Sequence, residues 1–185
     1  VHADVTGTYP QATNGTGQAW GGNRARKDLI NKFFPNGDAP NVSCTQMPAA
    51  ANDDRAIFDG LDRTLDNGEG YLSSFKFGFA VAKWNNFKTD NTVGHNDNYP
   101  DTDFFLFRVA EAYLTYAEAT ARLNGGSTTK EGTDAVNALR DRAHAVKRSG
   151  YSLSDLCDEW SREFYYEGLR RPTLIRFGRF GGNNN

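Results

Sequence analysis

The sequence is poor in the residues from which metal sites and disulfide frameworks are built. Its 185 residues include 2 cysteines and 3 histidines. Cys44 and Cys157 lie far apart without the spacing of a zinc site, and His2, His95 and His144 are scattered, so we expect no metal. Whether the two cysteines form a disulfide stays open, and they do not indicate a compartment.

The sequence also lacks a dominant charge and a long apolar run. Its formal net charge is -2 and its pI is about 5.9, so it offers no basic surface for nucleic acid. No apolar segment approaches the roughly 20 residues that a transmembrane helix needs. We therefore expect a soluble chain that binds no nucleic acid.

Recognisable catalytic and phosphate-binding motifs are missing as well. There is no G-x-S-x-G, and no G-K-S or G-K-T follows the glycine-rich segment NGTGQAWGGN at residues 14–23. Cys157 falls on the apolar side of a predicted helix, where a packed thiol is the usual state. We expect neither an active site nor a cofactor.

What is present predicts a helical core with many loops. The mean hydropathy is -0.68 and there are 19 glycines. We predict a mainly α single domain over residues 1–185, with short helices, long loops and a small β-hairpin in residues 1–100 and the core helices in residues 101–180. Because the chain starts at Val1 without an initiator Met or a signal segment, we expect it to be part of a longer protein.

Hydrophobic periodicity places the elements. Residues 75–81 alternate as in a half-buried strand, and residues 61–65 are the predicted hairpin partner. A helix is predicted from a cap at Asp101 or Thr102 to Asn124, with apolar residues on more than one side, so it should be buried on more than one side. A second helix from Thr133 should form an antiparallel pair with it.

The stretch SLSDLCDEWSREFYYEGLRRPTLIRFGRF, residues 152–180, predicts the last helix. Ser152 and Asp155 approximate a capping box, and Gly168 and Pro172 should loosen and then stop or kink the helix. One side carries apolar residues about one turn apart: Leu153, Leu156, Trp160 and Phe164.

The other side of this predicted helix carries charge. Glu163 and Glu167 are one turn apart, and Arg170 and Arg171 follow Glu167 at the i+3 and i+4 positions that form ion pairs. Two carboxylates can also serve as an acid/base pair. The nearby arginines favour a structural ion network.

Three blocks of sequence carry a family resemblance. Residues 159–180 read E-x-x-x-E-F-x-x-E-G-x-R-R-x-x-L-I-R-x-G-R-F, residues 102–126 read TDFFLFRVAEAYLTYAEATARLNGG, and residues 135–143 read AVNALRDRA. In order and spacing they resemble the C-terminal part of the SusD/RagB-like outer-membrane nutrient-binding lipoproteins. Asp53 and Arg55 are similar to a further Asp-x-Arg segment of that family.

The resemblance implies a fold and a function. The fold would be the SusD-like helical fold with tetratricopeptide-like helix packing. The protein would bind an oligosaccharide at the cell surface without cleaving it, and would deliver it to a SusC-like TonB-dependent transporter in the outer membrane. Its contact with the membrane would be an N-terminal lipid anchor outside this chain.

Sugar binding needs flat aromatic faces together with amides and charged groups for the hydroxyls. Trp20 in its glycine-rich loop, followed by Asn23 and Arg24, is similar in position to a glycan-stacking aromatic of the family, and Tyr71 is a weaker candidate. A loop Trp that fills the helical core is an equal alternative. The identity of the glycan, the contribution of an N-terminal part and the oligomeric state stay open.

Two other functions compete with glycan binding. A glycan-hydrolysing domain would need two carboxylates in one cleft. A purely structural helical interaction module would need neither a cleft nor a ligand. The surroundings of Glu163 and Glu167 distinguish the hydrolase from the other two.

Overall fold

The computed structural model describes residues 15–16, 23–66, 74, 76–96 and 99–181. Contacts divide the chain into two compact units. The first, called here the sheet unit, comprises Val1–Ala51 and Ala56–Asp103, and the second, the helical unit, comprises Asn52–Arg55 and Phe104–Asn185. The four residues 52–55 thus belong by their contacts to the helical unit, although the chain on both sides of them belongs to the sheet unit.

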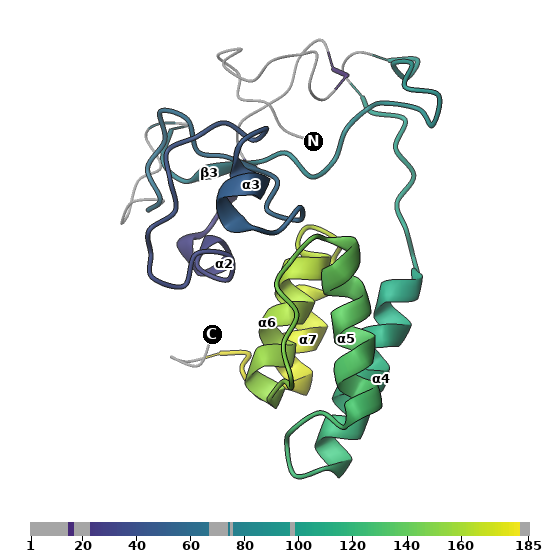
Figure 1. The fold of residues 1–185 in the computed structure, drawn as a ribbon. Coiled ribbons are helices and arrows are strands. Elements are labelled where there is room, and N and C mark those ends of the chain that lie inside the picture. The colour runs from purple at the N-terminus through teal and green to yellow at the C-terminus, as the bar shows by residue number, and fades with distance from the viewer. Residues whose placement is uncertain (1–14, 17–22, 67–73, 75, 97–98, 182–185) are drawn as a thin grey trace. The chain divides into compact units, whose positions relative to one another are not determined.

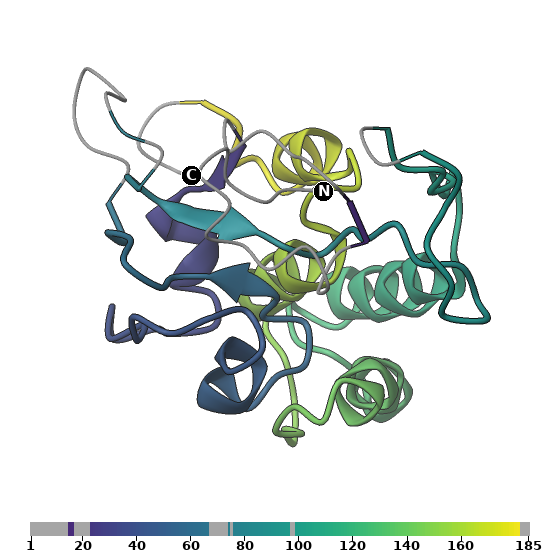
Figure 2. The same cartoon turned by 90° about the horizontal axis from the view of Figure 1, so that it is seen from above.

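The sheet unit contains a small antiparallel sheet. Its strands are β1 (Arg24–Ala25), β2 (Phe58–Asp59) and β3 (Phe79–Val81), with β3 in the middle (Figure 2). Helices α2 (Lys27–Ile30) and α3 (Met47–Ala51) belong to the same unit and supply buried apolar side chains. The largest fully buried side chains among the described residues of this unit are Phe58, Phe79, Ile30, Met47 and Val81.

The predicted strand over residues 75–81 is present in a shorter form and with other partners. Its antiparallel neighbours are β1 and β2, whereas Thr64 of the predicted partner 61–65 makes one isolated parallel bridge to Phe77. Gly60 directly follows β2 and lies close to β3, because a Cβ there would be 2.9 Å from the Phe79 ring. The chain leaves β2 at this glycine, and residues 61–65 do not extend the strand.

Four helices form the helical unit. Helix α4 (Val109–Leu123) and helix α5 (Lys130–Arg142) run antiparallel, and α6 (Leu153–Phe164) packs against α4 and α7 (Arg170–Arg176) (Figure 1). Thr129 caps α5 by accepting a hydrogen bond from the Gly132 amide. The core is built from Ala110, Leu114, Ala117, Ala121, Val136, Leu139, Tyr151, Leu156, Trp160 and Phe164.

Helix α4 starts later than the predicted cap at Asp101 or Thr102. Its N-cap residue is Arg108, with φ -145° and ψ 156°, and residues 104–107 precede it as non-helical, exposed chain. The prediction followed the apolar spacing through Leu106. The prediction was wrong: the backbone is still extended at Arg108, and the side chain of Arg108 is bonded to Glu163 and Glu167.

Helix α6 confirms the predicted capping box and corrects the predicted end. Ser152 accepts from the Asp155 amide and Asp155 accepts from the Ser152 amide. The helix ends at Phe164, since Tyr165 is extended and Tyr166 and Gly168 have φ values of 58° and 81°. Pro172 does not stop a helix. It lies in the first turn of α7, where a missing amide hydrogen leaves no bond unmade.

The predicted mainly α fold is confirmed. In the described part of the chain, no helix has both the length and the apolar character needed to cross a membrane.

Candidate functional site

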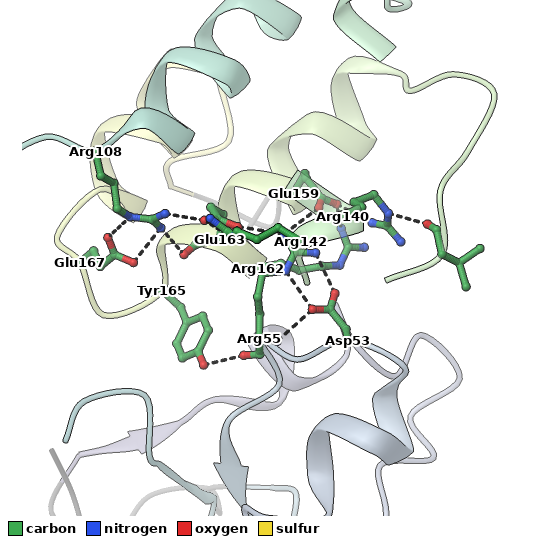
Figure 3. Close-up of polar contacts among 11 residues, drawn as sticks. Asp53, Arg55, Arg108, Arg140, Arg142, Glu159, Arg162, Glu163, Tyr165 and Glu167 are labelled. Carbon is green, nitrogen blue, oxygen red and sulfur yellow. Dashed lines mark hydrogen bonds and ion pairs between the residues drawn. The ribbon is translucent and has the colours of Figure 1, made fainter. Parts of the chain in front are cut away.

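Helix α6 carries two buried carboxylates at the centre of the helical unit. Glu159 and Glu163 are one turn apart on the same side of the helix, and their exposed fractions are 0% and 3%. A carboxylate removed from water stays ionised only where positive charge and hydrogen-bond donors replace the water. Arginines from several elements supply both (Figure 3).

Glu163 is bonded by three arginines. Arg142 from the end of α5 donates to its two oxygens over 2.7 and 2.8 Å, and Nη1 of Arg55 donates to Oε2 over 3.1 Å. Arg108 also donates to Oε1, and it donates to the main-chain oxygen of Glu163 over 2.7 Å. This side chain therefore joins the start of α4, the end of α5 and the segment 52–55.

Glu159 repeats the arrangement one turn earlier. Its Oε2 lies 2.7 Å from Nη1 of Arg140 and 2.8 Å from Nη1 of Arg162, and its Oε1 lies 2.9 Å from Nη1 of Arg55. Arg55 thus bridges the two glutamates of α6.

Arg55 is itself fixed by its neighbours in the chain. Asp53 accepts from Nε over 2.9 Å and from Nη2 over 2.7 Å, which is the two-bond fork typical of arginine and carboxylate. The hydroxyl of Tyr165 donates to the Arg55 main-chain oxygen over 2.7 Å. The side chain that reaches α6 therefore has a set orientation.

The charges in this network lower the pKa of Glu163. Burial alone would raise the pKa, but hydrogen bonds from Arg142 and Arg108 and the charge of Arg55 outweigh burial and bring the pKa to about 2. Burial also opposes the charge on Arg55, yet its bonds to Asp53 and the nearby glutamates raise the Arg55 pKa. Both groups are fully ionised at neutral pH.

Glu167 lies beyond the end of α6 and forms its own fork. Its two oxygens accept from Nε and Nη2 of Arg108 over 2.7 and 2.9 Å. The Arg108 guanidinium also lies 4.0 Å from the centre of the Phe164 ring. Arg108 therefore connects the carboxylates of Glu163 and Glu167.

The structure corrects the arginine partners that the sequence predicted for these carboxylates. Arg170 donates to the Cys157 main-chain oxygen over 3.1 Å, and the Arg171 guanidinium lies over the Phe180 ring. The predicted pairs assumed that the helix continues through Glu167. Because it ends at Phe164, the i+3 and i+4 spacing does not apply, and Arg108 bonds Glu167 instead.

A pocket of about 240 Å³ lies beside this pair. Glu111, Glu167 and Arg108 line it, together with Phe164, Gly168, Leu169 and residues 104–107. Both Glu167 oxygens are bonded to Arg108, and Glu111 in the first turn of α4 is the second carboxylate of the lining. Its remaining lining is mostly apolar.

Of the four residues predicted to bind glycan, the structure describes Asn23 and Arg24. Trp20 and Tyr71 lie outside the described residues. Asn23 is exposed, directly before β1, and Nη1 of Arg24 donates to the Ser74 main-chain oxygen over 2.6 Å. Their role in binding glycan stays a prediction.

Sequence reasoning missed the partners that complete the network. Arg55, Arg140 and Arg142 lie in other segments of the chain, and the prediction did not assign them to the glutamates. One signal exists for Arg55, because Asp53 and Arg55 resemble the Asp-x-Arg segment of the family. Among the described residues, no group of His, Cys, Asp and Glu is arranged to hold a metal ion.

These features define a helical module with a buried network of ion pairs, and comparisons with known proteins assign its family. The model of the SusD family matches residues 63–185. The starch-binding protein SusD of Bacteroides thetaiotaomicron is 35% identical over an alignment of 201 positions, which covers 91% of this chain and 35% of that protein. The SusD-like protein P25 of Formosa agariphila is 30% identical over 167 positions, which cover 83% of this chain and 29% of that protein.

The chain belongs to the SusD family. It spans about a third of the length of these two curated relatives. The predicted family is therefore confirmed.

Proposed function

We propose that this chain is part of a cell-surface protein that binds an oligosaccharide and does not cleave it. The observation that carries the proposal is its similarity, over 91% of its length, to a protein named for binding starch. The surroundings of Glu163 and Glu167 support the proposal that the protein does not cleave the oligosaccharide.

A glycan hydrolase needs one carboxyl group that donates a proton and a second that acts as base or nucleophile. Glu163 has a pKa of about 2 and holds three arginines, so at neutral pH it has no proton to give. Glu167 is held in a fork by Arg108. Either role would first require breaking buried ion pairs.

The sugar contact is proposed for the segment around β1. The Trp20 indole would stack on a sugar ring, Asn23 and Arg24 would bond its hydroxyl groups, and Tyr71 would add a second aromatic surface. The bond from Nη1 of Arg24 to the Ser74 main-chain oxygen holds the guanidinium beside β1.

We further propose the setting that the family resemblance implies. The complete protein would be held at the outer membrane by a lipid at its N-terminus and would pass its glycan to a SusC-like TonB-dependent transporter. Affinity purification of the tagged protein from outer membranes, followed by mass spectrometry, should recover such a transporter. If the purified protein carries no TonB-dependent transporter with it, the proposed partnership is contradicted.

Calorimetry with starch oligosaccharides and other glycans tests the site in the complete protein. Trp20→Ala should weaken binding by about 1–3 kcal/mol, as expected for the loss of one aromatic anchor. Tyr99→Ala is the matched control, because Tyr99 is an exposed aromatic of the same unit outside the proposed site. Unchanged binding by Trp20→Ala would remove this site, and absence of binding to every glycan would favour a structural module.

A further inference from the structure

Two Asn-Gly pairs lie in exposed turns of the described chain. They are Asn36–Gly37, a few residues after α2, and Asn124–Gly125, at the end of α4. The two glycines have φ values of 71° and 65°, and a Cβ built on either would meet nothing within 4 Å. An asparagine followed by glycine can lose its side-chain amide without an enzyme, because no side chain shields the glycine nitrogen that attacks it. Two pairs that are alike in sequence and exposure leave the choice between them to local hydrogen bonding.

The reaction is an internal substitution followed by hydrolysis. The backbone nitrogen of the glycine bonds to Cγ of the asparagine, and Nδ2 leaves as ammonia with the proton of the attacking amide. Water then opens the resulting cyclic imide. Cleavage of the new N–Cγ bond gives aspartate, whereas cleavage of the original peptide bond gives isoaspartate, whose main chain runs through Cγ. Water is the only co-reactant.

The nitrogen that must attack is hydrogen-bonded in one pair and not in the other. The Gly37 amide donates to the Phe34 main-chain oxygen over 3.0 Å, so attack on Asn36 first requires that this bond break. In the part of the chain that the structure describes, the Gly125 amide donates no hydrogen bond to another residue. The amide of Gly126 donates instead to the Ala121 main-chain oxygen over 2.8 Å and closes the end of α4.

The side chain of Asn124 lies along the turn that contains this nitrogen. Its Nδ2 donates to the Ser127 main-chain oxygen over 3.0 Å, within the connection from α4 to α5 (Figure 1). Asn124 has φ -109° and ψ 43°, and the main chain must rotate there before its Cγ meets the Gly125 nitrogen. The glycines at 125 and 126 permit this rotation, because they restrict the main chain least.

We propose that Asn124 is a modification site, at which spontaneous deamidation forms aspartate and isoaspartate several-fold faster than at Asn36. The free nitrogen of Gly125 carries the proposal, and the bonded nitrogen of Gly37 supplies the comparison.

The modification would act on the start of α6. The turn after Asn124 holds that start, because the Gly126 main-chain oxygen accepts from the Leu153 amide over 3.0 Å. Aspartate would place an oxygen where Nδ2 now donates to Ser127, and would add negative charge at the C-terminal end of α4, where the helix dipole opposes it. Isoaspartate would lengthen the main chain of the turn by one carbon. Both products therefore weaken the bond that Gly126 accepts from α6.

Peptide mapping of the complete protein tests the proposal. The folded protein is incubated in mildly alkaline buffer and digested, and mass spectrometry compares the peptides that contain Asn36 and Asn124 with those of fresh protein. The modified fraction at Asn124 should exceed that at Asn36 several-fold. An unmodified Asn124 would overturn the proposal, as would an Asn36 that reacts as fast.

Amide hydrogen exchange tests the effect on α6. Exchange of the Leu153 amide should become faster in the parent as Asn124 reacts. Asn124→Gln is the matched control, because it keeps an amide but would have to form a larger ring, and its exchange should not change during the same incubation. Asn124→Asp copies one product and should show the faster exchange from the start. If Leu153 exchanges alike in all three proteins after incubation, the proposed effect on α6 is wrong.

Discussion

Replacing Glu163 by Gln should destabilise the helical unit strongly and mainly at neutral pH. The substitution keeps the shape of the side chain but removes the negative charge shared by Arg55, Arg108 and Arg142. The pKa of Glu163 falls from 4.5 to about 2, and each pKa unit corresponds to about 1.4 kcal/mol, so its charge contributes about 3 kcal/mol. Breaking a buried ion pair by removing one partner costs about the same.

The sign of the pH dependence follows from the lowered pKa. A carboxylate with a depressed folded pKa contributes its full stability above its unfolded pKa and loses it as pH falls toward the folded pKa. In the parent, the contribution of Glu163 should thus be complete above about pH 5.5 and should disappear between about pH 5 and pH 2. The stability difference between the parent and Glu163→Gln should shrink over this range.

Urea unfolding at pH 7 and at pH 3 measures both effects. Glu131→Gln is the control, because Glu131 is an exposed glutamate in the first turn of α5 and its loss should cost less than about 1 kcal/mol. The reasoning is refuted if Glu163→Gln and Glu131→Gln unfold alike at pH 7. It is also refuted if the loss from Glu163→Gln is as large at pH 3 as at pH 7.

Two further substitutions probe the same helices. Arg108→Lys should lower stability by about 2–3 kcal/mol, because a single ammonium cannot form the fork to Glu167 and also bond Glu163. Thermal unfolding measures this loss, and a melting temperature like that of the parent would contradict the prediction. Ser152→Ala should lower stability by about 1 kcal/mol, because it removes the cap of α6, and it should increase amide hydrogen exchange in the first turn of that helix. The control Ser154→Ala should leave this exchange unchanged.

The parts of the structure that depend on local sequence were predictable. The capping box of α6 and its apolar side are set by residues within three or four positions of each other, and both are present. The late start of α4 was not predictable in this way. The N-cap residue Arg108 bonds Glu167, which lies 59 residues further along the chain, and no local pattern indicates that contact.

The partners of the buried glutamates show the same limit. Helical spacing can only propose partners close in sequence, and it pointed to Arg170 and Arg171. Arg55 lies 108 residues before Glu163 and reaches it because the segment 52–55 packs in the helical unit. The carboxylates themselves were identified, since two acidic residues one turn apart on an amphipathic helix are visible in the sequence.

The most direct test of the central proposal is to incubate the complete protein with starch oligosaccharides and measure binding and cleavage in the same sample. Calorimetry gives the affinity, and chromatography of the sugars after prolonged incubation shows whether they were shortened. We expect saturable binding of an oligosaccharide whose length is unchanged at the end. Shortened sugars whose release stops in Glu163→Gln or Glu167→Gln variants that remain folded would contradict the account.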